Sequence, residues 1–176
     1  MKIFLVAGKA GAGKQEVAKF IKEFYIYQKK DAVITEYSKY LKEYAKEMIG
    51  WDGLSATKPR KFLQDLGLYI RKDLNMPNFF TERMLEDLKV YDRDYDIAVI
   101  CDVRYPNEIK DIKNVYDDVV TILVINQFRG STLTVEEQIH PSEVALDSYD
   151  DFDYTIINND LNTVKKEIFS FLEGMK

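Results

Sequence analysis

The chain has 176 residues, of which 46% are hydrophobic and 31% are charged, as is usual for one soluble globular domain. Its formal net charge of -5, without a long run of Lys or Arg, argues against a polynucleotide partner held on a broad basic face. A single cysteine, Cys101, and a single histidine, His140, exclude an internal disulfide and a Cys/His zinc cluster.

Short apolar runs alternate with amphipathic stretches along the chain. The pattern predicts strands at residues 2–7, 32–37, 97–101, 119–125 and 154–157. It predicts helices at residues 14–27, 38–48 and 58–74, another that ends near residue 90, a short one that opens at Pro106, and a last one at residues 161–172. Strands that alternate with helices are typical of a three-layer α/β/α domain, here with roughly five strands in a mostly parallel sheet.

One domain is expected to cover residues 1–176, with two helical insertions. Residues 38–92 precede the strand at residue 97, and the weakly periodic residues 127–150 precede the strand at residue 154. Insertions beside a sheet are natural places for segments that clamp a substrate. Apolar stretches are far shorter than a membrane span, and the start has no apolar segment of signal-peptide length. We therefore expect a cytoplasmic protein without a membrane partner, as a monomer or homodimer.

A glycine-rich loop, Gly8-Lys9-Ala10-Gly11-Ala12-Gly13-Lys14, follows the first predicted strand and opens a helix. In that context the pattern predicts the phosphate-binding loop (P-loop) of an NTPase, since successive N–H groups and the helix N-terminus attract phosphate. An ordinary glycine-rich turn is the alternative, and the spacing does not fit a dinucleotide-binding fold. The residues expected to bind ATP here are Gly8, Ala10, Gly11, Ala12, Gly13, Lys14, Gln15 and Glu16.

The residue after Lys14 is Gln15, where the P-loop pattern usually has the Ser or Thr whose hydroxyl binds Mg²⁺. The amide oxygen of Gln15 is a candidate to bind the metal directly or through water. ATP binding itself rests on the backbone and on Lys14.

A polar stripe runs along the predicted helix at residues 58–74, for which Thr57 offers an N-cap. At about 100° per residue, one side of this helix carries Arg60, Gln64, Gly67 and Arg71. From geometry alone, the stripe is either a binding surface for a phosphate and a base or a solvated helix face. Ser38 and Lys42, at the start of the preceding helix, are lesser candidates for the same surface.

The apolar run at residues 97–101 ends in an acid, Asp102, as expected of a central parallel strand whose last carboxylate holds Mg²⁺ or its water. Arg104 follows just past the carboxyl end of this strand, where open α/β sheets bind ligands. Its guanidinium suits a phosphate. The alternative for Arg104 is a surface salt bridge, with Glu108 as the candidate partner.

The segment Asp102-Val103-Arg104-Tyr105-Pro106-Asn107-Glu108 closely resembles the Asp-Val-Arg-Phe-Pro-Asn-Glu segment of the phage-type deoxynucleoside monophosphate kinases, members of the P-loop kinase superfamily. Looser matches occur in the family's order at residues 8–14, 59–67, 140–143 and 157–159. The resemblance spans nearly the whole chain, and its most specific part is the segment at residues 102–108. Family members commonly have Asp after the P-loop Lys.

The resemblance implies phosphoryl transfer from ATP, with Mg²⁺, to a nucleoside monophosphate, with a deoxynucleotide expected. It implies acceptor binding by Ser38, Lys42, Arg60, Gln64, Arg71 and Arg104, and transfer at Lys14, Asp102, Arg104 and Arg129, with Gln15 and Asp102 at the metal. Arg129 would act from a closing lid, or is a plain surface residue. Asn158 and Asn159 are expected to contact the ATP base, to cap the last helix, or both. For His140 and Glu143 a structural role in the lid is expected.

Other functions stay open at this point. Dephospho-coenzyme A kinase shares the expected architecture and a similar Asn-containing last strand. A nucleotide-binding switch or regulatory ATPase is a different class, although the guanine-specific Asn-Lys-x-Asp motif is absent from the sequence. Gln15 also motivates a third reading, a non-catalytic relative of the kinases.

Overall fold

The computed structural model describes residues 1–126 and 133–175. Within them, one sheet has the strand order β2-β3-β1-β4-β5, and each pair of neighbouring strands is parallel. The strands are β1 (Lys2–Ala7), β2 (Ala32–Thr35), β3 (Ile97–Val103), β4 (Val119–Ile125) and β5 (Tyr154–Ile157). The three-layer fold predicted from the sequence is thereby confirmed, with a sheet that is parallel throughout the described residues.

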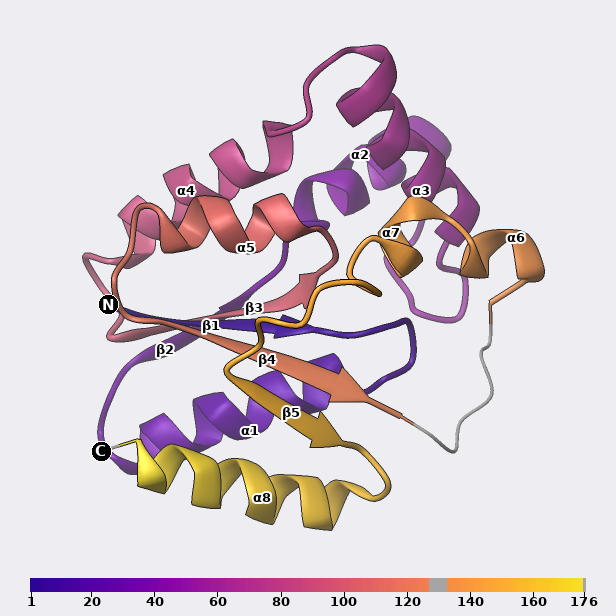
Figure 1. The fold of residues 1–176 in the computed structure, drawn as a ribbon. Helices are drawn as coiled ribbons and strands as arrows, with labels where there is room; N and C mark the ends of the chain where they lie inside the picture. The colour runs from indigo at the N-terminus through magenta and orange to yellow at the C-terminus, as the bar shows by residue number, and fades with distance from the viewer. Residues whose placement is uncertain (127–132, 176) are drawn as a thin grey trace.

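Helices cover both faces of this sheet (Figure 1). Helices α1 (Lys14–Tyr27) and α8 (Leu161–Gly174) pack side by side on one face. The other face lies under α4 (Phe79–Tyr91) and α5 (Pro106–Lys113), with α2 (Lys39–Ile49) and α3 (Arg60–Leu68) near the carboxyl ends of the strands. The short helices α6 (Val135–Gln138) and α7 (Pro141–Val144) also lie at that end.

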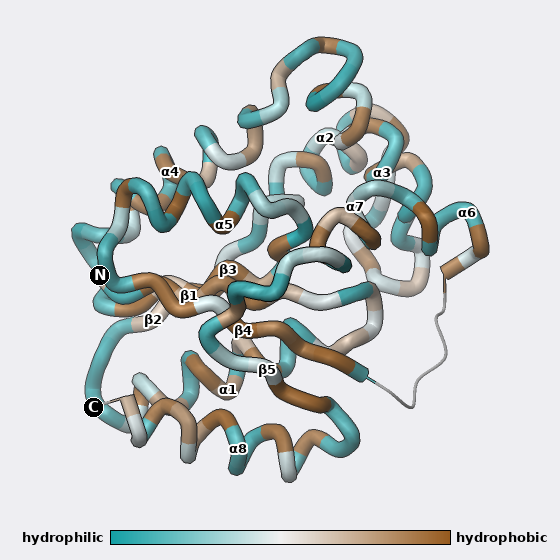
Figure 2. The backbone as a smooth tube through the Cα atoms, viewed as in Figure 1, coloured by the Kyte–Doolittle hydropathy of each residue, from teal (hydrophilic) through white to brown (hydrophobic). Residues whose placement is uncertain are grey.

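Strand β1 is buried on both faces because its side chains alternate between two cores. Phe4 and Val6 belong to the core under α1 and α8, while Ile3, Leu5 and Ala7 belong to the core under α2, α4 and α5. All five are fully buried, which explains why the strand is a continuous apolar run in the sequence. In Figure 2 the central strands are brown along most of their length, whereas the helices alternate between brown and teal.

The predicted helix at residues 58–74 is divided in the structure. Helix α3 ends at Leu68 and continues as a π-helical turn, η1 (Tyr69–Asp73). The prediction that Thr57 caps this helix is wrong, because the N-cap is Pro59. Thr57 instead closes the preceding loop on itself, with its hydroxyl bonded to Asp52 and 3.2 Å from the indole nitrogen of Trp51.

The carboxyl ends of the strands meet at one edge of the sheet, which is where the P-loop, Asp102 and the insertions lie. The pairing of β1 with β3 shifts register between Leu5 and Ala7, next to the end of β3 that carries Asp102. Helices long and apolar enough to cross a membrane do not occur within residues 1–126 and 133–175.

Candidate functional site

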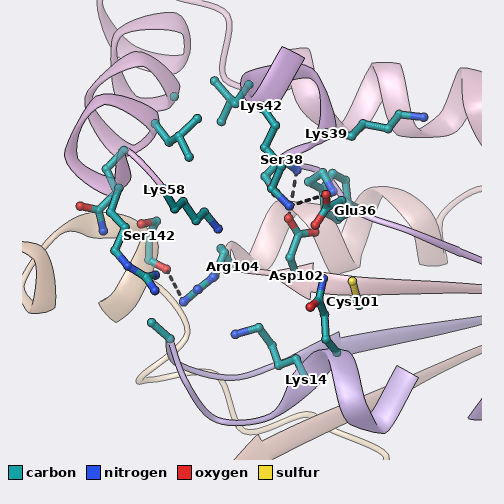
Figure 3. A pocket seen from close by; sticks show the side chains of 18 of the residues that line it. Lys14, Glu36, Ser38, Lys39, Lys42, Lys58, Cys101, Asp102, Arg104 and Ser142 are labelled. Atoms are coloured by element: carbon teal, nitrogen blue, oxygen red, sulfur yellow. Dashed lines mark hydrogen bonds and ion pairs between the residues drawn. The ribbon is translucent and has the colours of Figure 1, made fainter. Parts of the chain in front are cut away.

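A cavity of about 680 Å³ opens at the carboxyl edge of the sheet. Its walls come from the P-loop, the turn from β2 into α2, helix α3, the end of β3, and the segment around α7. Lys14, Lys58 and Arg104 extend into this space from three different parts of the chain (Figure 3). The arrangement brings the predicted phosphate loop and the predicted acceptor helix to one site.

The P-loop has a backbone conformation that requires glycine at its end. Gly13 has a φ of 100°, and a Cβ added there would lie 2.1 Å from Nδ2 of Asn158. That amide nitrogen donates a hydrogen bond to the carbonyl oxygen of Ala12 (2.8 Å), and the Asn158 N–H donates to Ile125 O (2.7 Å). Asn158 is buried and therefore supports the P-loop from behind, where β5 ends.

Lys14 is folded back onto its own loop. Its Nζ donates to the carbonyl oxygens of Gly8 (2.6 Å) and Lys9 (2.9 Å), and the residue is 9% exposed. Burial lowers the pKa of Lys14 to about 7, and the positive charge of Arg104 is the second cause of this shift. A phosphate chain in the cavity would favour the charged form of this amine.

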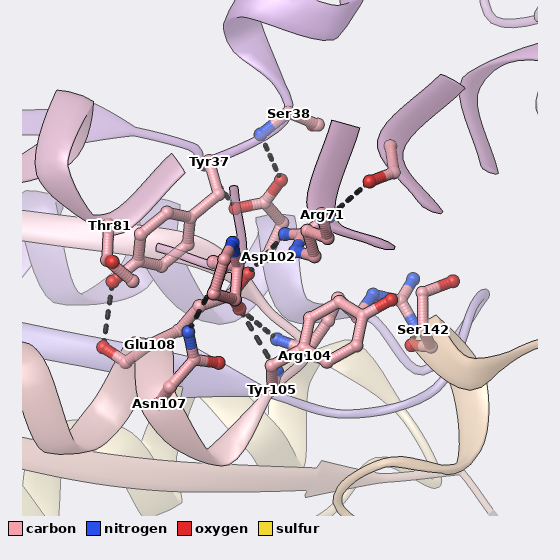
Figure 4. Close-up of polar contacts among 12 residues, drawn as sticks. Tyr37, Ser38, Arg71, Thr81, Asp102, Arg104, Tyr105, Asn107, Glu108 and Ser142 are labelled. Atoms are coloured by element: carbon pink, nitrogen blue, oxygen red, sulfur yellow. Dashed lines mark hydrogen bonds and ion pairs between the residues drawn. The ribbon is translucent and has the colours of Figure 1, made fainter. Parts of the chain in front are cut away.

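Asp102 binds the backbone at the start of helix α2. Its Oδ1 accepts the N–H of Tyr37 (2.7 Å) and its Oδ2 accepts the N–H of Ser38 (3.0 Å), as Figure 4 shows for Ser38. The carboxylate thus positions the turn after β2. Each oxygen keeps a second lone pair that can bind a metal ion or its water.

Arg104 is paired with an acid that the sequence did not suggest. Its Nη1 lies 2.7 Å from Oε2 of Glu143 on helix α7, and the same nitrogen lies 3.4 Å from the carbonyl oxygen of Ser142. The alternative expectation, a salt bridge from Arg104 to Glu108, is wrong. Glu108 Oε2 instead accepts the backbone N–H groups of Arg104 (2.7 Å) and Tyr105 (3.1 Å).

The partner of Glu108 is Arg71. Arg71 Nη2 donates to Glu108 Oε1 (2.9 Å), across the wall between η1 and α5 (Figure 4). Burial raises the pKa of Glu108 to about 7, against the lowering effect of the Arg71 charge. The hydroxyl of Tyr37 donates to the carbonyl oxygen of Glu108 (2.8 Å). Glu108 therefore also connects helix α5 to the segment between β2 and α2.

The wall opposite the P-loop is rich in cations. Lys42 forms an ion pair with Glu36, whereas the side chains of Lys58 and Arg60 have no hydrogen bond or ion pair with another described residue. Burial lowers the pKa of Lys58, and the positive charges of Lys42 and Arg60 lower it further. Gln64 Nε2 lies 3.4 Å from the carbonyl oxygen of Glu137, which links α3 to the segment around α6.

Most residues predicted for the site line the cavity: Ala10, Gly11, Gly13, Lys14, Gln15, Glu16, Ser38, Lys42, Arg60, Gln64, Arg71, Asp102 and Arg104. Gly8 and Ala12 belong to the loop but do not line the cavity. Ala12 is buried, and a Cβ on Gly8 would be 2.4 Å from Val124 O. Asn159 is exposed, and the expectation that Asn158 or Asn159 caps the last helix is wrong, because Asp160 is its N-cap. Arg129 lies outside the described residues.

Lys58 and Glu143 are among the cavity residues that were not predicted for binding. Lys58 lies two residues before Arg60 in the sequence, and this local cluster of positive charge was the available signal. Glu143 contacts the P-loop, since its Oε2 accepts the Ala10 N–H (2.9 Å). The two residues are 133 positions apart, so no local pattern indicates the contact.

The sequence matches no protein-family model and no curated protein. By structure, the chain is similar to an unliganded sugar kinase from a Janibacter species, with a TM-score of 0.51, 10% identity, and coverage of 98% of this chain and 95% of that one. It is also similar to the shikimate kinase of Aquifex aeolicus (TM-score 0.49, 16% identity, 99% and 97% covered) and to the APS kinase of Mycobacterium tuberculosis (TM-score 0.47, 12% identity, 98% and 96% covered).

At these identities the likeness concerns the fold. The chain shares its α/β fold with the Janibacter enzyme, and this fold agrees with the three-layer architecture expected from the sequence. Membership of the phage-type deoxynucleoside monophosphate kinases stays a prediction from residues 102–108.

Proposed function

We propose that this chain transfers the γ-phosphoryl group of ATP to a nucleoside monophosphate, with a deoxynucleotide as the expected acceptor, to give ADP and the nucleoside diphosphate. The observation that carries the proposal is one cavity with the P-loop on one side and, on the other, two cations, Lys58 and Arg60, whose side chains have no ion pair within the described part of the chain. Such a cavity can hold two phosphorylated ligands with their phosphates between the walls.

The P-loop side suits a triphosphate. Backbone N–H groups of the loop and Lys14 are donors that bind the β- and γ-phosphates of ATP in this type of turn. Lys14 now bonds to two carbonyl oxygens of its own loop, and phosphate oxygens are stronger partners for an ammonium group. We therefore expect Lys14 to exchange these carbonyls for phosphate when ATP binds.

The same side fits Mg²⁺ carried by a nucleotide. In phosphoryl-transfer sites Mg²⁺ is usually bound by one or two carboxylates together with substrate phosphates. Asp102 and Gln15 line the cavity and offer one carboxylate and one amide oxygen. When bound, the metal would neutralise charge on the β- and γ-phosphates.

The opposite side suits an anionic acceptor. Lys58 and Arg60 have no counter-charge within hydrogen-bond distance among the described residues, so a phosphomonoester would supply one. A neutral sugar, the acceptor class named for the similar Janibacter enzyme, would leave both cations without a partner. Trp51 and Leu41 also line the cavity and offer apolar surface to a base.

The residues of this chain would act mainly by position and charge. Phosphoryl transfer requires aligned oxygens and neutralised charge more than a strong base. Lys14 extends into the cavity from the P-loop and Arg104 from the end of β3, and both would stabilise negative charge on the transferring group. Asp102 would keep the start of α2, with Ser38, beside the acceptor through its two backbone hydrogen bonds.

The test is a panel of common NMPs and dNMPs with ATP and Mg²⁺, read by coupled ADP formation, with dephospho-coenzyme A and a hexose as further acceptors. We expect turnover with at least one nucleoside monophosphate and none with the hexose. Turnover with dephospho-coenzyme A alone would replace the proposed acceptor. ATP binding without transfer to any acceptor would instead support a regulatory nucleotide-binding protein.

A further inference from the structure

Glu143 is a buried acid that the proposed function does not use. Its side chain is 5% exposed, although it lies on the short helix α7 within the predicted lid region. Within the described residues its carboxylate has two polar partners, and both are donors: the backbone N–H of Ala10 in the P-loop (2.9 Å) and the guanidinium of Arg104 (2.7 Å). These donors come from the two parts of the site to which the proposed function assigns phosphate binding.

A single atom, Oε2 of Glu143, makes both contacts. A P-loop N–H group and an arginine guanidinium that both donate to the same oxygen form a binding site for one anionic oxygen. Because the carboxylate already holds both donors, a phosphate oxygen can engage them only after Glu143 has left. The carboxylate thus stands where the oxygen of a phosphoryl group would stand.

We propose that the Ala10 N–H and the Arg104 guanidinium form the subsite for the transferring phosphoryl group, and that Glu143 occupies this subsite as an internal anion until ATP displaces it. This inference rests on the proposed function, since it takes the P-loop to bind a triphosphate. It adds a site for one phosphate oxygen and a residue that competes for it.

Two further contacts hold the α7 segment in place, one to the P-loop and one to Arg104 after β3. Lys9 Nζ pairs with Asp147 (2.9 Å), and Arg104 Nη1 is 3.4 Å from Ser142 O. The Lys9–Asp147 pair is exposed on both sides, so it contributes little to stability. The segment is therefore held to the loop chiefly by Glu143, and the exchange of this one carboxylate for phosphate would release it.

The segment also contains a buried hydrogen-bonding atom, Nε2 of His140, without a partner among the described residues. His140 Nδ1 accepts the N–H of Ser142 (3.2 Å), which places the ring proton on Nε2. Nε2 is buried and has no partner among the described residues. A buried donor without an acceptor is energetically unfavourable. A position of the segment that gives the Nε2–H group an acceptor would therefore be favoured over this one.

The first experiment is calorimetric titration with inorganic tripolyphosphate, which tests the phosphate subsite without a base or an acceptor. In Glu143→Gln the carboxylate charge is lost while the shape is kept. We expect the variant to bind tripolyphosphate at least tenfold more tightly than the unmodified chain. Glu136→Gln is the matched control, because Glu136 lies exposed on α6 and has the same charge change; its affinity should equal that of the unmodified chain.

Equal or weaker binding by Glu143→Gln would overturn the inference and leave Glu143 as a support for Arg104. Lys14→Ala separates this failure from failure of the proposed function. If Lys14→Ala abolishes tripolyphosphate binding while Glu143→Gln does not tighten it, the P-loop binds phosphate but Glu143 does not compete with it. If binding is absent in the unmodified chain or unaffected by Lys14→Ala, the proposed function fails and the inference fails with it.

A second measurement needs no variant of Glu143. Hydrogen exchange of the unmodified chain is followed with and without tripolyphosphate. We expect the P-loop amides to become better protected, and residues 141–147 to become less protected as their contact with the loop is lost. Ligand binding with unchanged or increased protection at residues 141–147 would contradict displacement of Glu143.

Discussion

Arg71 and Glu108 form an ion pair of 2.9 Å whose side chains are only 16% and 2% exposed. The guanidinium is also enclosed by two aromatic rings, with its central carbon 4.3 Å from the ring centroids of both Phe80 and Tyr105. Arg71 Nη1 further contacts Gly67 O (3.3 Å). Arg71 thus lines the cavity with a guanidinium that already has partners on several sides, in contrast to Arg60, whose side chain has no partner among residues 1–126 and 133–175.

Replacing Arg71 by Ala should destabilise the chain by about 3 kcal/mol, because it leaves Glu108 buried without its charged partner. Denaturant unfolding followed by the fluorescence of the single tryptophan, Trp51, measures this. The control is Arg83→Ala, which removes an exposed pair with Glu86 and an aromatic contact with Phe79, and should cost less than about 1 kcal/mol.

The same variant tests the role that the sequence assigned to Arg71. If Arg71→Ala unfolds like the unmodified chain but raises the KM of the acceptor, Arg71 binds substrate as predicted from the polar stripe. If stability falls and the remaining folded enzyme keeps its KM, the residue holds the wall of the site.

Asn158→Ala should weaken binding of both ATP and inorganic tripolyphosphate by about tenfold, which corresponds to about 1.4 kcal/mol. The reason is that the Asn158 side chain supports Ala12 O at the P-loop, so its loss loosens the amides that hold phosphate. Asn159→Ala, at an exposed position, is the matched control and should bind both ligands normally.

Comparison of ATP with tripolyphosphate distinguishes support of the P-loop by Asn158 from the contact with the ATP base that the sequence suggested for this residue. A residue that contacts the adenine base would weaken ATP binding when removed and leave tripolyphosphate binding unchanged. That pattern in Asn158→Ala would contradict a support role behind the loop.

The elements that the sequence predicted best are those whose pattern is local. Strand β1 and helix α1 begin and end at the predicted residues, because an uninterrupted apolar run and an amphipathic helix flank a glycine loop. The P-loop and Asp102 also follow from strand ends, since the carboxyl ends of parallel strands share one edge of a sheet.

Partners distant in the sequence could not be predicted in this way. Arg71 and Glu108 are 37 residues apart, and the π-helical turn at Tyr69–Asp73 changes the direction that a regular helix would give to Arg71. Arg104 was assigned either a phosphate or the nearby Glu108, whereas its partner, Glu143, comes from another insertion. Both outcomes depend on how the insertions fold over the sheet edge, which helical periodicity does not describe.

Gly13→Ala should abolish ATP binding and lower stability by about 2 kcal/mol or more, because the new Cβ meets Asn158 Nδ2 at 2.1 Å and the backbone has a φ of 100°. Gly11→Ala is the comparison, since Gly11 also has a positive φ (77°) but open space for a Cβ. It should show only backbone strain, about 1 kcal/mol. Equal effects at both glycines in thermal unfolding and ATP titration would mean that the contact with Asn158 is unimportant.

Lys58→Gln should raise the KM of the acceptor about tenfold and, at the same time, stabilise the ligand-free chain by about 0.5 kcal/mol. The first effect follows from loss of a cation that the acceptor phosphate would meet and that has no ion pair with a described residue. The second follows from relief of repulsion by Lys42 and Arg60, two of the causes of the lowered pKa of Lys58. Lys89→Gln, exposed on α4, gives the same charge change and should alter neither quantity. A normal KM in Lys58→Gln would remove this lysine from the acceptor site.

The stability gained in Lys58→Gln should depend on pH, and the sign follows from proton binding. The pKa of Lys58 is lower in the folded chain than its ordinary value of 10.5. Between these values the unfolded chain binds the extra proton, so the unfolding free energy of the unmodified chain rises with pH in this window. The variant lacks this group, and its advantage should therefore be present at neutral pH and shrink as the pH rises toward 10.5. Urea unfolding of both proteins at a series of pH values from neutral upward measures the difference, with Lys89→Gln as the reference. A difference that grows with pH would mean that Lys58 gains, rather than loses, a favourable interaction for its charge on folding.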